Sequence, residues 1–269
     1  MAENVLIDIS HVHKSFHVGI QDIHVLKDIS FQILHGDFVV IFGPSGCGKS
    51  TLLHIILGLE GPTTGTLTFL GKNLYETNIE DNRSDFRKKH IGMVYQQPNW
   101  IKSLTVIENV AFPLLLLGKT RADSITKASQ LLEMVGMLEW AHYAPTELSS
   151  GQQQRIALVR ALVTDPEVII ADEPTGNLDY EAGQALMELL QQMNETQKKT
   201  IIMVTHDLEY IKYAKSAIRI FDGKVLNTYT EKNKHELLTD IKSKRGTNAV
   251  DGTNKISFIH KSAKVEKSV

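Results

Sequence analysis

The fold is decided by residues 38–57, which read Phe-Val-Val-Ile-Phe (38–42), Gly-Pro-Ser-Gly-Cys-Gly-Lys-Ser-Thr (43–51) and Leu-Leu-His-Ile-Ile-Leu (52–57). The first apolar run is typical of a strand covered on both faces, and the second favours a helix. The stretch between them has the spacing G-x-x-x-x-G-K-S, which is typical of loops that hold nucleotide phosphates when a strand precedes and a helix follows. That context disfavours a plain glycine-rich turn. We therefore predict a strand, a phosphate-binding loop and a helix.

Each residue type in this loop has a chemical purpose. Its three glycines let successive backbone N–H groups point at one anion, and the helix that begins near Lys49 adds its positive end. Lys49 is expected to reach the β- and γ-phosphates, and Ser50 is expected to bind a Mg²⁺ ion that bridges them. The predicted nucleotide-binding residues of the loop are Gly43, Pro44, Ser45, Gly46, Cys47, Gly48, Lys49, Ser50 and Thr51.

Cys47 is the single cysteine of the chain, which excludes an intramolecular disulfide and a zinc site built on paired cysteines. This usage is typical of a reducing compartment. Its place beside a helix N-terminus could lower the pKa of the thiol and expose it to alkylation. The alternative, which we favour, is that Cys47 is a small filler of the loop.

A second informative stretch ends on two acids. Residues 168–171 read Val-Ile-Ile-Ala, and Asp172 and Glu173 follow directly. Ligands of open α/β sheets bind at the carboxyl ends of the strands, so these carboxylates are expected beside the phosphate loop. Asp172 would hold Mg²⁺ through its water shell, and Glu173 would polarise an attacking water. Together with the loop, the pair predicts hydrolysis of the bound nucleotide rather than a strand that merely ends in exposed acids.

A third stretch, Leu148-Ser-Ser-Gly-Gln-Gln-Gln-Arg155, resembles the signature that separates ABC-type ATPases from other phosphate-loop proteins. The order of the motifs and the run Asp172-Glu-Pro-Thr-Gly-Asn-Leu-Asp179 look most like the lipoprotein-release, macrolide-export and cell-division branch of that family. The resemblance covers about residues 5–228. Independently of the family, Ser149 or Ser150 can cap a helix whose first N–H groups form a second anion site.

The resemblance implies roles for further residues. Phe16 would stack on adenine, and Gln96 would contact both Mg²⁺ and the attacking water. His206 would hydrogen-bond the γ-phosphate beside Glu173. Asp179 would cross a dimer interface, although by itself it is also a plausible helix N-cap. The implied catalytic residues are Glu173, His206 and Gln96, the metal ligands are Ser50, Gln96 and Asp172, and the further nucleotide contacts are Phe16, Ser149, Gly151, Gln152 and Asp179.

The same resemblance implies that the signature of one subunit closes on the γ-phosphate held by another, with two ATP molecules sandwiched in a head-to-tail dimer. We expect the second ABC ATPase subunit to be a copy of this chain. The family usually has glycine where this chain has Ser150. Serine caps helices at least as well as glycine, so we expect a mild effect. The alternative is a weakened signature in one half of a heterodimer.

Strand candidates recur at residues 5–9, 29–33, 38–42, 66–69, 91–95, 168–171, 201–205 and 218–221, whereas residues 97–164 have helical spacing, including 124–135 and 152–164. With the resemblance, this pattern predicts an α/β fold: a P-loop (RecA-like) core with a mainly parallel sheet, an antiparallel β subdomain and an inserted helical lobe. The nucleotide-binding domain would span 1–229, with its core at 1–95 and 165–229 and its lobe at 96–164. Residues 230–269 are predicted to be a polar, basic, flexible tail with a possible short helix over 235–241.

Composition limits the partners. Of 269 residues, 42% are hydrophobic and 22% charged, as in ordinary globular proteins, and the net charge of −2 argues against nucleic acid as a partner. Residues 241–269 carry seven Lys and Arg against two Asp and Glu, which leaves −7 for residues 1–240. This tail could touch acidic lipid headgroups, although a solvated terminus is the favoured interpretation. Apolar runs such as 111–117 fall short of the roughly 20 residues that cross a bilayer, and the acidic N-terminus does not resemble a secretory signal.

We therefore predict a peripheral ATPase subunit that uses ATP and Mg²⁺ at the cytoplasmic face of a membrane. It would drive separate integral membrane permease subunits of an export or extraction complex, and the groove for that partner is expected near residues 96–104 and 110–117. The alternatives are a regulatory ATPase of a cell-division or cell-wall complex and the ATPase of a nutrient importer. DNA-repair and translation ATPases are disfavoured, because the sequence contains neither a long coiled-coil insertion nor a second cassette.

Overall fold

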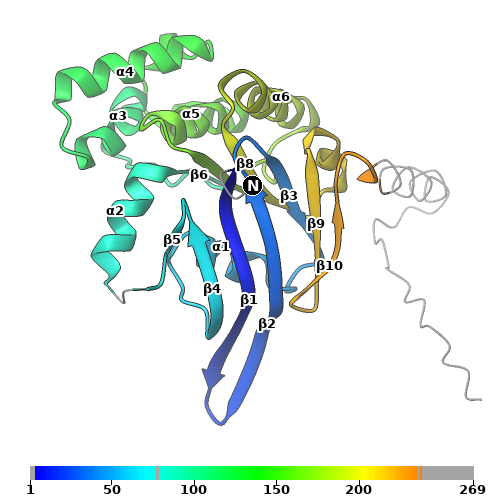
Figure 1. Cartoon of the computed structure of the whole chain (residues 1–269). Coiled ribbons are helices and arrows are strands. Elements are labelled where there is room, and N and C mark those ends of the chain that lie inside the picture. The colour runs from blue at the N-terminus through cyan, green and yellow to red at the C-terminus, as the bar shows by residue number, and fades with distance from the viewer. Residues whose placement is uncertain (1–3, 77–78, 235–236, 238–269) are drawn as a thin grey trace, which may run out of the picture.

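The computed structural model describes residues 4–76, 79–234 and 237 and arranges them around two sheets (Figure 1). The six-stranded sheet has the order β10 (Lys224–Tyr229), β9 (Ser216–Phe221), β3 (Phe38–Phe42), β8 (Thr200–Thr205), β7 (Val168–Asp172) and β6 (Ile91–Tyr95). Its strands are parallel except β10, which pairs antiparallel with β9. The four-stranded antiparallel sheet has the order β2 (Gln21–Leu34), β1 (Val5–Val18), β4 (Thr64–Phe69) and β5 (Lys72–Asn73).

Helices cover both faces of the parallel sheet, which explains why its strands are apolar on both sides. In β3, Val39 and Ile41 pack into a core shared with helix α1 and the antiparallel sheet, whereas Phe38, Val40 and Phe42 pack into a core shared with α5 and α6. A third apolar cluster joins α3, α4 and α5. The helices are α1 (Lys49–Ile56), α2 (Glu80–His90), α3 (Val106–Leu116), α4 (Arg121–Met134), α5 (Ser150–Leu162) and α6 (Tyr180–Gln197), with 3-10 turns at Leu138–Trp140, Pro145–Glu147 and Leu208–Tyr213.

The predicted fold class is confirmed: an α/β core with a mainly parallel sheet, an antiparallel sheet and helices inserted between β6 and β7. All eight predicted strands are present, and α3, α4 and α5 occupy the stretch between residues 97 and 164. Figure 1 shows these three helices together at one end of the molecule. The boundaries proposed for core and lobe stay a prediction. The possible helix over 235–241 lies outside the described residues apart from position 237, and so does the predicted tail of 230–269 apart from positions 230–234 and 237.

Two predicted strands were too short. β1 and β2 form a hairpin with 14 residues in each strand, where the sequence pattern indicated only 5–9 and 29–33. Their pairing contains several register shifts, and His11 and Asp28 adopt positive φ angles of 49° and 62°. Such irregularities break the period-two alternation by which a strand is found in a sequence.

Three further elements were missed for related reasons. Helix α2 has no buried residue, so its sequence shows no apolar stripe, and β5 has only two residues. Strand β10 has no fully buried side chain, and its place depends on pairing with β9. In the described part of the chain, no helix has the length and apolar character needed to cross a membrane.

Candidate active site

The phosphate loop leaves β3 and leads into α1, and two of its glycines are required by the surrounding structure. A Cβ atom on Gly43 would lie 2.1 Å from the carbonyl oxygen of Ile220. Gly48 has a φ angle of 102°, and a Cβ atom there would lie 2.8 Å from a methyl carbon of Leu26. Glycine avoids both conflicts because it has no Cβ atom and adopts positive φ without strain. The loop is thus held tightly against β9 and β2.

Lys49 is buried, and its ammonium group lies over the loop. The group donates hydrogen bonds to the carbonyl oxygens of Gly43, at 2.9 Å, and of Pro44, at 3.0 Å. An ammonium carries three N–H donors, so one remains for an incoming anion. Lys49 also lines a pocket of about 250 Å³ together with Val25, Ser45, Gly46, Gly48, Ser50, Thr51, Asp172, Glu173 and Val204. The structure therefore brings the loop and both predicted carboxylates into one pocket.

Asp172 is the last residue of strand β7 and lines this pocket. Burial raises the pKa of its carboxyl group, the charge of Glu173 raises it further, and His54 and Lys49 act in the opposite direction. A carboxylate whose charge is disfavoured in this way gains from a nearby cation. No group of three His, Cys, Asp or Glu side chains within the described residues could hold a metal ion. Oxygen ligands from Ser50 and Asp172 nevertheless fit Mg²⁺, which typically takes one or two protein ligands and completes its shell with substrate phosphates and water.

Glu173 and His206 contact each other directly. The Glu173 carboxylate accepts a hydrogen bond from Nδ1 of His206 at 2.9 Å and lies 3.4 Å from the His206 backbone nitrogen. The carboxylate is mostly buried, with 20% of the side chain exposed, whereas the His206 side chain is 69% exposed. Glu173 also has a φ angle of 47°, a left-handed conformation that costs free energy in a non-glycine residue. Strained backbone of this kind is concentrated at functional sites, which fits the catalytic role expected of Glu173.

The signature stretch forms the start of α5. Ser149 is the N-cap: its hydroxyl accepts a hydrogen bond from the Gln152 backbone nitrogen at 3.3 Å, and the Gln152 side chain accepts one from the Ser149 backbone at 2.9 Å. This capping box leaves Ser150 as the first helical residue, with an exposed side chain. The first N–H groups of a helix have no acceptor within that helix, so the start of α5 is suited to bind an anion.

Asp179 and Gln96 both lie close to the signature stretch at the start of α5. Asp179 caps α6 by accepting a hydrogen bond from the Ala182 backbone nitrogen at 2.8 Å. A Cβ atom on Gly151 would lie 2.9 Å from the Cβ of Ala182, so the starts of α5 and α6 are in close contact. A Cβ atom on Gly176 would lie 2.6 Å from Nε2 of Gln96, which places the Gln96 side chain on the turn that follows Glu173.

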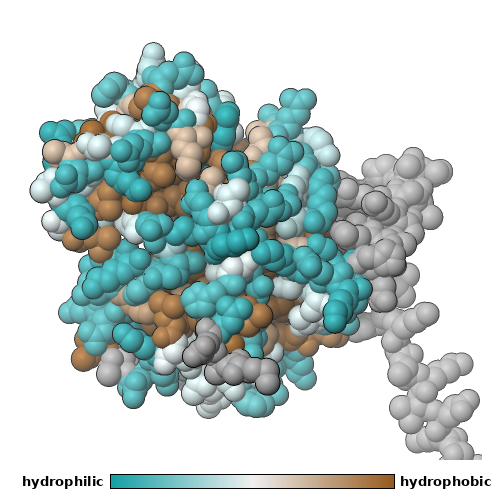
Figure 2. Space-filling model, turned by 45° about the horizontal axis from the view of Figure 1, so that its top comes forward, coloured by the Kyte–Doolittle hydropathy of each residue, from teal (hydrophilic) through white to brown (hydrophobic). Residues whose placement is uncertain are grey.

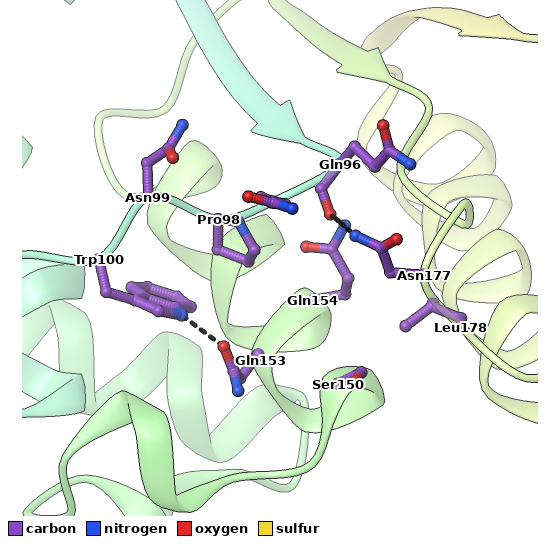
Figure 3. A pocket seen from close by; sticks show the side chains of 10 residues that line it. Gln96, Pro98, Asn99, Trp100, Ser150, Gln153, Gln154, Asn177 and Leu178 are labelled. Carbon is purple, nitrogen blue, oxygen red and sulfur yellow. Dashed lines mark hydrogen bonds between the residues drawn. The ribbon is translucent and has the colours of Figure 1, made fainter.

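Within one chain, the remaining predicted residues stay apart from the phosphate pocket. Gln96 and Ser150 line a different pocket of about 320 Å³, shown in Figure 3. Ser149, Gly151, Gln152 and Asp179 do not line the phosphate pocket. Phe16 lies half-buried on β1, with the Lys14 ammonium 4.8 Å from the centre of its ring. A nucleotide held by both the loop and the signature would therefore need a second copy of the chain.

Comparison with known proteins agrees with this geometry. The ABC transporter family matches residues 26–176. The chain belongs to the ABC transporter family. It is similar to the macrolide export protein MacB of Aggregatibacter actinomycetemcomitans, with 43% identity over 82% of this chain and 34% of MacB. It is also similar to the methionine import protein MetN of Vibrio vulnificus, with 38% identity over 81% of this chain and 63% of MetN. The dimeric structure of the cassette MJ0796 from Methanocaldococcus jannaschii, bound to ADP and Pi, matches with a TM-score of 0.77 and 36% identity over 84% of this chain and 98% of that one. This ABC cassette is thus an ATP hydrolase.

The packing of Cys47 favours the filler interpretation over a reactive thiol. Cys47 is buried, with 6% of its surface exposed, and burial raises the pKa of its thiol despite the nearby charge of Lys49. Its sulfur packs beside Gly43, where a Cβ atom would lie only 2.9 Å away. The favoured interpretation of Cys47 as a small filler of the loop agrees with this packing.

Two residues of the cassette were missed by the sequence analysis. Gln154 of α5 is buried and bonds to backbone atoms of two other segments, and Asn177 donates to the Gln96 carbonyl oxygen at 3.3 Å. The sequence did contain a clue to the burial of Gln154. Together with Ala157, Leu158 and Ala161 it has the spacing i, i+3, i+4 and i+7, which places all four on the buried face of one helix. A polar residue on such a face needs buried hydrogen-bond partners. Asn177 offered no comparable clue.

Proposed function

We propose that this ABC cassette binds ATP with Mg²⁺ at the phosphate loop, closes head to tail on a second copy, and drives separate integral membrane permease subunits of an export or extraction complex. It would act at the cytoplasmic face of the membrane. The observation that carries the catalytic part is the contact of 2.9 Å between Glu173 and His206 beside the phosphate pocket. The similarity to MacB supports export.

The chemistry follows from the groups around the pocket. Lys49 and the loop N–H groups would bind the phosphates, and the partly buried Glu173 carboxylate would accept a proton from the attacking water. His206 would hold that carboxylate in place, because its Nδ1–H bond restricts the rotation of the Glu173 side chain. When bound through Ser50 and Asp172, which both line the pocket, Mg²⁺ would supply positive charge to the phosphates.

A second copy would complete each site. The signature residues do not line the phosphate pocket of their own chain, and the related cassette MJ0796 has been solved as a dimer. Each γ-phosphate would then be held by the loop of one subunit and by the start of α5, near Ser149 and Gly151, of the other. Once hydrolysis is complete and the phosphate has left, this shared ligand would be gone, so ATP would favour the closed dimer more than ADP alone does.

The membrane partner would dock in a groove of about 520 Å³ beside the helical lobe. Asn99, Ile101, Phe112, Pro113 and Leu116 contribute to it, which is where the sequence analysis expected it. Its other lining residues are Leu57, Leu59, Arg87, Lys88, Ile91, Gly92, Met93, Tyr95, Arg160, Ala161 and Thr164. The lining contains no acidic residue. Figure 2 shows hydrophobic surface exposed between the hydrophilic side chains of the lobe.

Arg160 indicates the chemistry of that partner. Its guanidinium stacks on Trp100 with 4.6 Å to the ring centre and donates to the carbonyl oxygens of Pro98 and Asn99. Burial lowers the pKa of Arg160, and none of the ion pairs found among the described residues involves it. A half-buried cation without a carboxylate favours a partner that brings one. We therefore expect an amphipathic cytosolic segment of a permease with an Asp or Glu on its apolar side.

The decisive experiment is to purify the full-length chain from detergent-solubilised membranes of its own cells and to identify the integral membrane protein that accompanies it. Leu116, 55% exposed in the groove, is replaced in the variant Leu116→Asp, and the matched control is Leu138→Asp, at a 41% exposed leucine that does not line the groove. We expect a permease to accompany wild type and the control but not Leu116→Asp. Retention by Leu116→Asp would remove the groove as the docking site. An importer permease or a division protein as the partner would replace the export assignment by the corresponding alternative.

The catalytic assignment has its own test. Glu173→Gln should bind ATP and trap the closed dimer in size-exclusion chromatography, because it removes the proton acceptor without changing the size of the side chain. Steady-state turnover at the wild-type rate in this variant would remove Glu173 from the catalytic role.

A further inference from the structure

Gln154 connects three segments that carry functional residues. It lies on the first turns of α5 with 2% of its surface exposed. Its Nε2 donates to the carbonyl oxygen of Pro174 at 2.7 Å and of Tyr95 at 2.9 Å, with Gln96 O more distant at 3.4 Å. A carboxamide nitrogen has two hydrogens, so the two short bonds use both of its donors.

The accepting carbonyls adjoin catalytic candidates. Tyr95 immediately precedes Gln96 at the end of β6, and Pro174 immediately follows Glu173. Figure 3 shows the Gln154 side chain directed towards this junction, where Asn177 adds a bond to the Gln96 carbonyl. The Gln154 amide thus ties the end of β6 to the turn that carries Glu173.

The oxygen of the Gln154 amide is in an unfavourable environment. Oε1 of Gln154 is the one buried side-chain oxygen or nitrogen that lacks a hydrogen-bond partner among the described residues. A buried acceptor without a partner destabilises a fold, whereas an apolar side chain such as the neighbouring Ala157 or Leu158 would avoid that cost. Packing therefore does not explain a glutamine at this position, and the two donated bonds do.

We propose that Gln154 is a positioning residue that transmits nucleotide contact at the start of α5 to Glu173 and Gln96. Gln154 is two residues beyond Gln152 of the capping box, on the same rigid helix. A displacement of α5 on meeting the partner's nucleotide would pass through Nε2 to Pro174 and Tyr95. Glu173 is held at a φ angle of 47°, and such a conformation persists only when its surroundings hold it. The inference rests on the proposed catalytic role of Glu173.

The test compares two variants of the full-length cassette. Gln154→Met removes both donors at similar volume. Gln154→Glu keeps the shape but turns a carboxylate towards carbonyl oxygens, and only its protonated form donates one hydrogen bond. Gln130→Glu, on the exposed face of α4, is the control for a charge introduced by the same exchange. Single-turnover hydrolysis and the affinity for ATP are measured between pH 6 and pH 8, with the melting temperature of each variant.

We expect Gln154→Met to lower the single-turnover rate roughly 100-fold, the scale on which small misplacements act. The affinity for ATP should stay within about threefold, because Gln154 does not touch the phosphate loop, and this separates positioning from binding. The rate of Gln154→Glu relative to wild type should rise as the pH falls, since protonation restores a donor. Gln154→Met and Gln130→Glu should show no such change in ratio.

Wild-type turnover in Gln154→Met would overturn the inference, as would parallel losses of rate, ATP affinity and melting temperature, which indicate a purely structural role. If Gln154→Met does not fold, a rate ratio for Gln154→Glu that does not change with pH would overturn it. Glu173→Gln keeps the two proposals distinguishable. Its failure to abolish turnover would reject the assignment of Glu173, whereas an inactive Glu173→Gln beside a fully active Gln154→Met would reject only the role of Gln154.

Discussion

The contact between the starts of α5 and α6 makes a quantitative prediction. In Gly151→Ala, the new Cβ would lie 2.9 Å from the Cβ of Ala182, about half an ångström closer than ordinary van der Waals contact. Overpacking of this kind costs typically about 1–3 kcal/mol, and the better helix propensity of alanine returns up to about 1 kcal/mol. We therefore expect Gly151→Ala to lower the free energy of unfolding by about 1–2 kcal/mol.

A change at Ala182, which faces Gly151, tests whether the clash between the two side chains causes this loss of stability. Ala182→Gly removes the facing methyl group, so the double variant Gly151→Ala with Ala182→Gly should fit without the clash. The double-mutant cycle should show a favourable coupling energy of about 1–3 kcal/mol between the two positions. Urea denaturation of the four proteins measures this energy, and single-turnover hydrolysis measures whether activity returns with stability.

One result would refute the reasoning. A coupling energy near zero would show that α5 and α6 are not limited by this contact. Restored stability without restored hydrolysis would leave the packing argument intact and would support the nucleotide contact proposed for Gly151, because the contact with Ala182 would then have been relieved.

Three further predictions concern the predicted site residues. Burial and the charge of Glu173 raise the pKa of Asp172, so the folded state binds more protons than the unfolded chain between the ordinary and the raised pKa, and wild type loses stability as the pH rises through that window. Asp172→Asn should therefore melt higher than wild type at pH 7 without nucleotide, with a difference that shrinks towards pH 4, and equal melting temperatures at pH 7 would contradict this. Because Cys47 is buried and the pKa of its thiol is raised, alkylation followed by mass spectrometry should be slow in the native cassette and fast in urea; rapid native labelling that ATP prevents would show the opposite. Ser150→Gly should change the single-turnover rate by less than about threefold, since Ser149 is the cap, and a large gain would favour a weakened signature in a heterodimer.

Local patterns in the sequence were sufficient where the chemistry is local. The phosphate loop is built from nine consecutive residues, and its backbone N–H groups, glycines and lysine act on one another at short range. A cap at the start of α5 was also predicted, but between Ser149 and Ser150 it was left open; the structure assigns it to Ser149, whose capping-box partner Gln152 is three residues away. The apolar strand before Asp172 also predicted the position of its carboxylate, because parallel strands end at a common edge.

Tertiary structure decided the features that depend on distant partners. Gln154 bonds to Tyr95 across 59 residues and to Pro174 across 20, and nothing adjacent to Gln154 in the sequence specifies those acceptors. The environment of Cys47 was likewise decided by packing, because burial overcame the local influence of the helix start and raised the pKa of the thiol. The β1–β2 hairpin contains register shifts, so its residues do not alternate regularly between apolar and polar. Its extent is therefore determined by the pairing of the two strands and not by a local pattern. Short-range hydrogen-bond chemistry is therefore readable from the sequence, whereas burial and long-range pairing exist only once the chain has folded.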